Sequence, residues 1–460
     1  MLKFIKLIII AISIVLLAGS GYLIYNFYNQ SFDISLPIQN LKGSSPESTA
    51  LIKAGDDFKN ENDYKNAIKS YLSAHNENPD AASPYIGIGT IYYQLEKFDL
   101  AEKNLTSAYT KGPLDTNSSN IFLRILIQNN ELAKATELVK KIKEPNTESV
   151  FLDAILNLNK GNHKIFQEDI IKLSSLTTND KYVELSKILL KSNEIFLTFT
   201  DSPISYLQVL AAQNLIDNKE HVIARSLLFS SLKIKNDYRD AYLLLGYSLL
   251  LSDKNKDAEQ ALEKSLQIDP YFAKSHFYYG LSLLKQEDYQ NSIASFLQAL
   301  SSNYEPKFDV YKNLGNAYFE IAEYQKAADN YYLAQNITPL SLNETSKLLE
   351  ILIERLNNPV EALNIANKNC IMPETNAKSS ALLGYALLSN QKKSEAKNHL
   401  LNSIKIDPND PETYIYIAKL NVAENKKTEA KTNLEKAKSI SKNPKLSARI
   451  NTEIDKLNSM

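Results

Sequence analysis

Histidine and cysteine are the side chains that most often bind metals or act as nucleophiles, and this sequence offers few of them. Cys370 is the only cysteine, so neither an intrachain disulfide nor a thiolate metal site can form. The sequence contains no HExxH, GxSxG, P-loop or GxGxxG motif. The five histidines do not lie at ligand spacing from one another: His75, His163, His221, His276 and His399. We therefore expect no enzymatic activity, no catalytic residue, no metal and no cofactor.

The charge of the chain argues against a nucleic-acid partner. Lys and Arg total 52 and Asp and Glu total 53, so the net charge is close to zero. Nucleic-acid-binding proteins usually carry a basic stripe rich in arginine, whereas the few arginines here are scattered. Hydrophobic residues make up 44% of the chain, which is typical of a folded protein. With only 12 Gly and 15 Pro, the composition favours helices joined by short turns.

The N-terminal segment 7–25 holds nineteen residues without a charge, enough for a helix to cross a hydrocarbon core of about 30 Å. Lys3 and Lys6 precede it, and the next basic residue is Lys42. The positive-inside rule then predicts a single-pass protein with residues 1–6 in the cytoplasm and the remainder on the extracytoplasmic side of the cell membrane.

A cleavable signal peptide is the alternative interpretation of this segment. The small residues Ala18-Gly19-Ser20 form a possible cleavage site, and cleavage would release the chain as a secreted or periplasmic protein. We favour the uncleaved anchor because the apolar run continues beyond that site to Tyr25. Residues 26–47, which contain several Ser, Gly and Pro, are interpreted as a linker.

From about residue 48 the same residue types return every 34 residues. Small residues such as Gly55 and Ala67 would allow two antiparallel helices to approach closely, large ones such as Phe58 and Tyr71 would fill the space beside that contact, and a proline would end the second helix. The first two copies are Leu51, Gly55, Phe58, Ala67, Tyr71, Ala74 and Pro79, followed by Tyr85, Gly89, Tyr92, Ala101, Leu105, Ala108 and Pro113.

This pattern resembles the tetratricopeptide repeat (TPR). The resemblance implies an all-α protein, a right-handed α-solenoid of stacked helix-turn-helix pairs, here preceded by a single transmembrane helix. It also implies that the protein binds other proteins or peptides. Later copies of the pattern contain Gly246, Gly280, Gly315, Gly384 and Ala418.

Three stretches depart from the pattern and leave the number of repeats open by two or three: 116–147, 148–203 and 342–372. We therefore expect an N-terminal block of partly degenerate repeats, a C-terminal block of clearer repeats, and a helix that caps the open end. The boundaries predicted for these three parts are 48–204, 205–444 and 445–460.

In this family the first helix of each pair lines the concave face, which the resemblance makes the candidate partner-binding surface. An apolar groove between residues 243 and 284 would accept an amphipathic helix or an extended peptide. The alternative is that these side chains pack between repeats and expose little. The candidate positions are Leu243, Tyr247, Leu250, Phe277, Leu281, Leu284, Lys312, Asn316 and Phe319.

Lys312 and Asn316 also match the first pair of the carboxylate clamp with which some TPR domains hold the C-termini of chaperones. The next repeat offers Ser346 and Glu350 at the corresponding positions, so the clamp is not completed. The sequence as a whole predicts a membrane-anchored scaffold for protein interactions. The alternative is a non-catalytic regulatory subunit of a cell-envelope enzyme or of a secretion or pilus assembly complex. The sequence gives no indication of oligomeric state.

Overall fold

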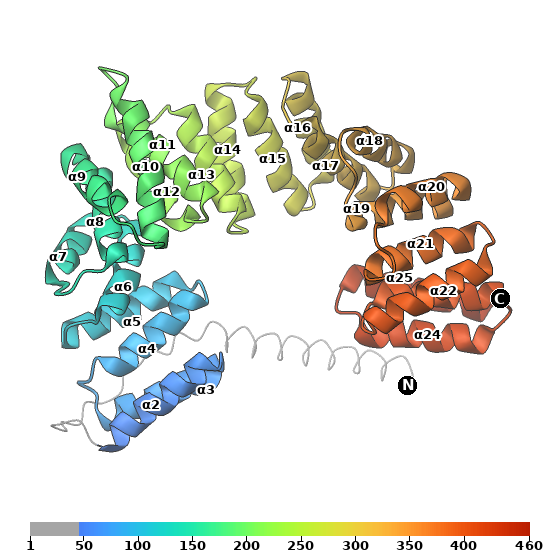
Figure 1. Cartoon of the computed structure of the whole chain (residues 1–460), viewed down its shortest axis with the longest axis horizontal. Helices are drawn as coiled ribbons and strands as arrows, with labels where there is room; N and C mark the ends of the chain where they lie inside the picture. The colour runs from blue at the N-terminus through green and yellow to red at the C-terminus, as the bar shows by residue number, and fades with distance from the viewer. Residues whose placement is uncertain (1–45) are drawn as a thin grey trace, which may run out of the picture. The chain divides into compact units, whose positions relative to one another are not determined.

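The computed structural model describes residues 46–460, and all regular structure in that range is helical (Figure 1). The 24 α-helices of this range are joined by short turns, and neighbouring helices pack as antiparallel pairs. The all-α architecture of stacked helix pairs predicted from the sequence is confirmed for these residues.

The described chain divides into two compact units, of which unit 1 ends at Lys235. Its helices are α2 (Pro46–Asn60), α3 (Tyr64–Glu77), α4 (Ser83–Gln94), α5 (Phe98–Lys111), α6 (Thr116–Gln128), α7 (Leu132–Lys141), α8 (Thr147–Asn159), α9 (His163–Ser174), α10 (Lys181–Leu197), α11 (Ile204–Asp217) and α12 (His221–Ile234).

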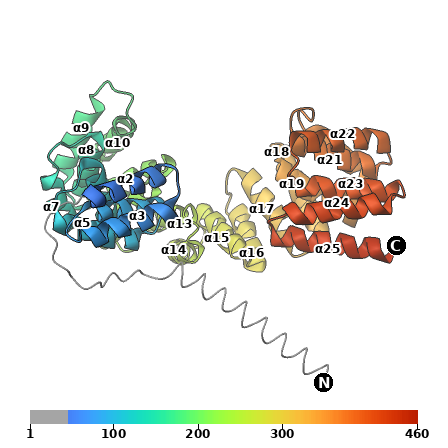
Figure 2. The ribbon, with the colours of Figure 1, turned by 90° about the horizontal axis from the view of Figure 1, so that it is seen from below.

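Unit 2 begins at Asn236. Its helices are α13 (Arg239–Leu250), α14 (Asn255–Ile268), α15 (Ala273–Lys285), α16 (Tyr289–Ser301), α17 (Lys307–Glu320), α18 (Tyr324–Ile337), α19 (Leu342–Glu350), the π-helix η1 (Ile351–Arg355), α20 (Pro359–Asn369), α21 (Ala377–Ser389), α22 (Lys393–Ile406), α23 (Pro411–Ala423), α24 (Lys427–Ile440) and α25 (Pro444–Ser459). Figure 2 shows α23, α24 and α25 side by side at the end of this unit.

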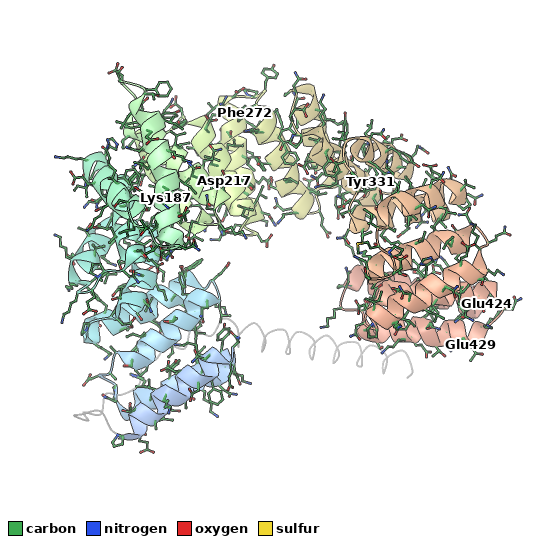
Figure 3. The ribbon with its side chains drawn as sticks, in the orientation of Figure 1. Lys187, Asp217, Phe272, Tyr331, Glu424 and Glu429 are labelled. Carbon is green, nitrogen blue, oxygen red and sulfur yellow. The ribbon has the colours of Figure 1, made fainter. Side chains whose placement is uncertain are left out.

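In six of the pairs, the two helices approach closely because the first one, α2, α4, α13, α15, α17 or α21, carries a glycine. A Cβ atom on Gly315 would lie 2.7 Å from the ring of Tyr331, which is fully buried inside the stack (Figure 3). The same relationship joins Gly280 to Phe296 and Gly384 to Leu400, always sixteen residues apart. The small and large residues of the sequence repeat are therefore in direct contact within these pairs.

The turn inside each pair contains one residue in the left-handed region, which reverses the chain direction. This residue recurs at intervals of 34 in three runs: Asn62, Glu96 and Asn130; Lys219, Asp253 and Glu287; Asn357, Gln391 and Asn425. Asn is the most frequent type, as expected for a position that most other side chains disfavour. The interval shows that the stretch 116–147, which the sequence marked as degenerate, keeps the repeat geometry in α6 and α7.

The other two degenerate stretches break that interval in different ways. Residues 148–203 form three helices, α8, α9 and α10, so α10 stands as an additional helix between two pairs. In the stretch 342–372, the first helix continues into the π-helix η1. There the backbone N–H groups bond to the carbonyl five residues earlier instead of four, as Leu356 does to Ile351. Beside it, the left-handed turn residues Ala322 and Asn357 are 35 residues apart.

Unit 1 extends to Lys235, whereas the second block of repeats was predicted to start at residue 205. The reason is that α11 and α12 bond to the helices before them. Gln208 donates a hydrogen bond to the carbonyl of Leu158, and Ser230 donates one to Asn159. Arg124 on α6 also lies 2.8 Å from Glu220, the residue that precedes α12.

Within residues 46–460, no helix combines the length and the apolar character that crossing a membrane requires. The segment 7–25, on which the predicted anchor rests, lies outside the described residues, as does most of the predicted linker.

Candidate functional site

The nine candidate positions lie on the first helices of three consecutive pairs, α13, α15 and α17. Three of the apolar ones, Leu243, Leu250 and Phe277, are each only 6% exposed, because they pack inside and between the pairs. The other four, Tyr247, Leu281, Leu284 and Phe319, are half-buried. Aromatic stacking fills much of this region, with the Phe277 ring 4.3 Å from that of Tyr304.

The polar candidates are engaged by neighbouring side chains. Lys312 lies 2.9 Å from the carboxylate of Asp309 on its own helix. The side-chain carbonyl of Asn316 accepts hydrogen bonds from the Tyr331 hydroxyl, at 3.0 Å, and from the Lys347 ammonium, at 2.9 Å. Lys312 and Asn316 thus bond to different neighbours and do not form a joint site for a ligand carboxylate.

A cavity of about 720 Å³ opens in unit 2 where the first helices α15, α17 and α19 face α25. Of the nine candidate residues, it is lined by Leu284, Asn316 and Phe319; the remaining six are not among its lining residues. We call this cavity the groove. Its size suits a peptide segment or a few side chains of a partner protein.

The lining of the groove is dominated by charged side chains of both signs. Five carboxylates face it, from Glu287, Glu320, Glu344, Glu350 and Glu412. Five cations face it too, from Lys285, Lys347, Lys378, Lys445 and Arg449.

Two of these cations, Lys445 and Arg449, lie one helical turn apart on α25 and reach back to much earlier repeats. The Lys445 ammonium lies 3.1 Å from Glu287 and 3.2 Å from Glu320. The Arg449 guanidinium lies 2.9 Å from Glu350 and 3.4 Å from Glu354. These contacts place α25 along one wall of the groove.

Glu354, in the π-helix η1, is the most connected carboxylate behind this wall. It accepts hydrogen bonds from the Tyr385 hydroxyl, at 2.7 Å, and from the Lys419 ammonium, at 2.8 Å, in addition to Arg449. Burial would raise the pKa of Glu354, but the Lys419 ammonium, the hydrogen bonds and Arg449 together lower it to about 2. The carboxylate therefore stays ionised at every physiological pH.

Arg449 and Glu350 respond to burial in different ways. Burial would lower the pKa of Arg449, but the carboxylates of Glu350 and Glu354 raise it above its ordinary value. Burial raises the pKa of Glu350. The positive charge of Arg449 lowers this pKa, and the negative charge of Glu354 offsets part of that lowering. The cation on α25 is thus held by charges that α19 and η1 supply.

Sequence reasoning did not find Glu287, Glu320, Lys445 or the role of Arg449. No local pattern marks them, because the paired residues are far apart in the sequence: Glu287 and Lys445 are separated by 158 positions. The one available signal is that Arg449 is among only five arginines and lies in the predicted capping helix. In the part of the chain that the structure describes, no group of three or more His, Cys, Asp or Glu side chains is placed to hold a metal ion.

Several solved structures are similar to this chain at low sequence identity and low TM-score. Yeast Tom70 is 15% identical, with 90% of this chain and 96% of that chain covered and a TM-score of 0.32. A tetratricopeptide repeat protein from Parabacteroides merdae is 14% identical, with 56% and 99% covered and a TM-score of 0.41. PilF of Pseudomonas aeruginosa is 17% identical, with 47% and 97% covered and a TM-score of 0.36.

A search of the curated proteins found no match. Two family models, both described as tetratricopeptide repeat, match three segments of unit 2. Two of the matched segments cover the pairs α13 with α14 and α21 with α22, and the third runs from the second half of α15 to the end of α18. The chain therefore carries tetratricopeptide repeats at residues 240–272, 280–340 and 377–410.

Proposed function

We propose that the protein is a non-catalytic scaffold that binds a partner protein or peptide in the groove of unit 2. The observation that carries the proposal is the groove itself, which is lined by the first helices of successive repeats and combines apolar side chains with charged ones. Leu284 and Phe319 supply apolar contact, while the carboxylates and ammonium groups around them fix the orientation of a ligand.

Photocrosslinking from within the groove tests this function. A photoreactive phenylalanine at position 319 keeps the shape of Phe319, a half-buried residue of the lining. The control carries the same group in place of Tyr271, which is 76% exposed in the turn before α15 and is not a lining residue. We expect a partner adduct of one reproducible mass from position 319 only. Equal adducts from both positions, or none from position 319, would overturn the proposal.

We further propose that residues 7–25 hold the scaffold at the cell membrane, with the repeats on the extracytoplasmic side. The nineteen uncharged residues and the preceding Lys3 and Lys6 support this arrangement. A reporter enzyme that is active only outside the cytoplasm, fused to the C-terminus, should be active and should sediment with membranes. Activity in the soluble extracytoplasmic fraction would instead indicate signal cleavage, and an inactive, stably expressed fusion would contradict the orientation.

A further inference from the structure

The first half of α25 occupies the groove through basic side chains four positions apart. Lys445 bridges carboxylates that follow α15 and end α17, and Arg449 bridges carboxylates of α19 and η1. Four acidic side chains from three successive repeats, Glu287, Glu320, Glu350 and Glu354, therefore form a row that one helix contacts. We call these four residues the acidic row.

The charge of the groove depends on α25. Lys445 and Arg449 are two of the five cations of its lining, so without them five carboxylates would face three ammonium groups. One of those three, Lys285, also pairs with Asp253 outside the groove. With α25 in place the lining is neutral, and without its two cations the lining is acidic and favours a basic ligand.

The helix α25 is attached to the rest of unit 2 by apolar contacts and by ion pairs. Ile450 and Leu457 are buried in an apolar cluster with Leu434, and Leu446 in the first turn of α25 packs against the same cluster. The first turn is held by Leu446 and by the ion pairs of Lys445, whose side chain is 64% exposed. Exposed ion pairs contribute little free energy and are screened by salt, so the turn before Ile450 is the most weakly held part of α25.

Arg449 is more buried than Lys445, and its departure alone would leave Glu350 and Glu354 without their guanidinium partner. Losing one partner of a buried ion pair is costly, because the remaining charge stays desolvated. A ligand that brings its own cation to the same carboxylates avoids this cost, since one buried pair replaces another. The energetics therefore favour exchange of α25 for a second basic helix over simple opening.

We infer that the groove takes a partner helix with two basic residues four positions apart, which replaces the first half of α25 on the acidic row. The inference rests on the proposed function, because it names the class of partner for the same groove. In the absence of that partner, α25 is an intramolecular ligand that keeps the groove neutral and partly covered.

The test uses a fluorescent peptide with the sequence of residues 443–459 and the full chain extracted in detergent. Lys445→Gln in the chain weakens the hold of α25 but leaves the acidic row intact. Fluorescence anisotropy should show this variant binding the peptide about two- to five-fold more tightly than the unmodified chain, the factor that corresponds to one exposed ion pair. Lys442→Gln removes the same charge three residues earlier from an exposed side chain outside the groove lining, and should bind the peptide like the unmodified chain.

A second peptide, with Gln in place of both Lys445 and Arg449, separates charge recognition from apolar docking. We expect this second peptide not to bind at the chain concentrations at which the first peptide binds. Equal binding of both peptides, equal binding to the chain and to its Lys445→Gln variant, or no binding at all would overturn the inference. If the chain forms a dimer and the peptide dissociates it, the groove binds α25 of a second copy. That result would also overturn the inference. An adduct from position 319 can still form in each of these cases, so failure of the inference and failure of the proposed function are distinguishable.

Discussion

Arg449 on α25 donates a hydrogen bond to Glu354 in the π-helix η1, across 95 residues of sequence. The same carboxylate accepts from Lys419 on α23 and from Tyr385 on α21, so the first helices of three later layers converge on it. The π-helix is what departs from the repeat here, and Glu354 is its fourth residue. A local irregularity of the backbone thus lies where polar contacts from α21, α23 and α25 meet.

Replacing Glu354 with Gln should destabilise unit 2 by about 3–5 kcal/mol, because Lys419 and Arg449 would lose a buried counter-charge. The pKa of Glu354 is lowered in the folded protein from 4.5 to about 2. The ionised Glu354 therefore contributes its full stabilisation above the pKa of the unfolded chain, 4.5, and this stabilisation is lost as the pH falls towards 2. Urea denaturation between pH 2 and 5 should show a steep dependence that the variant lacks. The exposed Glu374→Gln serves as the control, and an unchanged pH dependence in Glu354→Gln would contradict the assignment.

Replacing Gly87 with Ala should destabilise unit 1. The new Cβ would lie 2.3 Å from the ring of Tyr71, which is fully buried and whose hydroxyl donates to Asp56. Overpacking of this kind costs about 1–3 kcal/mol, which outweighs the gain of about 1 kcal/mol in helix propensity. Gly112→Ala, whose Cβ would meet only Ala82 at 3.9 Å, should stay within about 0.5 kcal/mol of the parent chain in the same urea titration. Equal effects would rule out the close-contact explanation.

Replacing Ala322 with Gly should stabilise unit 2 by about 0.5–1 kcal/mol. Ala322 is exposed and has a φ of 61°, a conformation in which its Cβ crowds the following carbonyl. Glycine removes that strain, at some entropic cost in the unfolded chain. Ala322→Val should shift the thermal midpoint in the opposite direction, since a β-branched side chain disfavours this region still more. If both variants melt alike, the turn tolerates side chains without strain.

Replacing Asp169 with Asn should stabilise unit 1 at neutral pH. One carboxylate oxygen of Asp169 is buried and, within the described residues, accepts no hydrogen bond. Burial, followed by the charge of Asp153, raises the pKa of Asp169 to about 6. Since the folded state prefers the neutral carboxyl, the penalty is absent below the unfolded pKa near 3.8 and complete above 6.

The expected gain for Asp169→Asn is about 1–3 kcal/mol at pH 7, reduced by partial solvent screening, and it should vanish near pH 4. Urea denaturation at the two pH values measures it. Asp201→Asn, in an exposed turn, is the matched control. A variant that is no more stable than the parent at pH 7 would show that Asp169 is solvated in solution.

The thiol of Cys370 should react slowly with a thiol-specific reagent at pH 8. Its side chain is 5% exposed, and burial raises its pKa to about 12, so almost no thiolate is present. Addition of urea should make one thiol per chain reactive at the rate of a free cysteine. Rapid reaction of the folded protein would place Cys370 in a segment that opens.

Much of the fold follows from the sequence because the contact that defines each pair is local. Gly315 and Tyr331 are sixteen residues apart, and their sizes alone dictate that the two helices meet there. The same reasoning predicted close pairing at Gly55, Gly89, Gly246, Gly280 and Gly384. It could not show that residues 148–203 contain three helices, or that η1 adjusts the backbone, because neither feature has a residue pattern of its own.

The candidate site was predictable only in part. The resemblance pointed to the first helices, and Leu284, Asn316 and Phe319 do line the groove. Whether Leu243 and Phe277 bind a partner stays a prediction, although both are almost fully buried.

The sequence by itself determined the helix pairs and their small–large contacts, because these depend on residues within one repeat. Only the tertiary structure decided that Lys445 and Arg449 meet the acidic row. That meeting depends on the curvature which accumulates over several repeats of unit 2, and no single repeat encodes it.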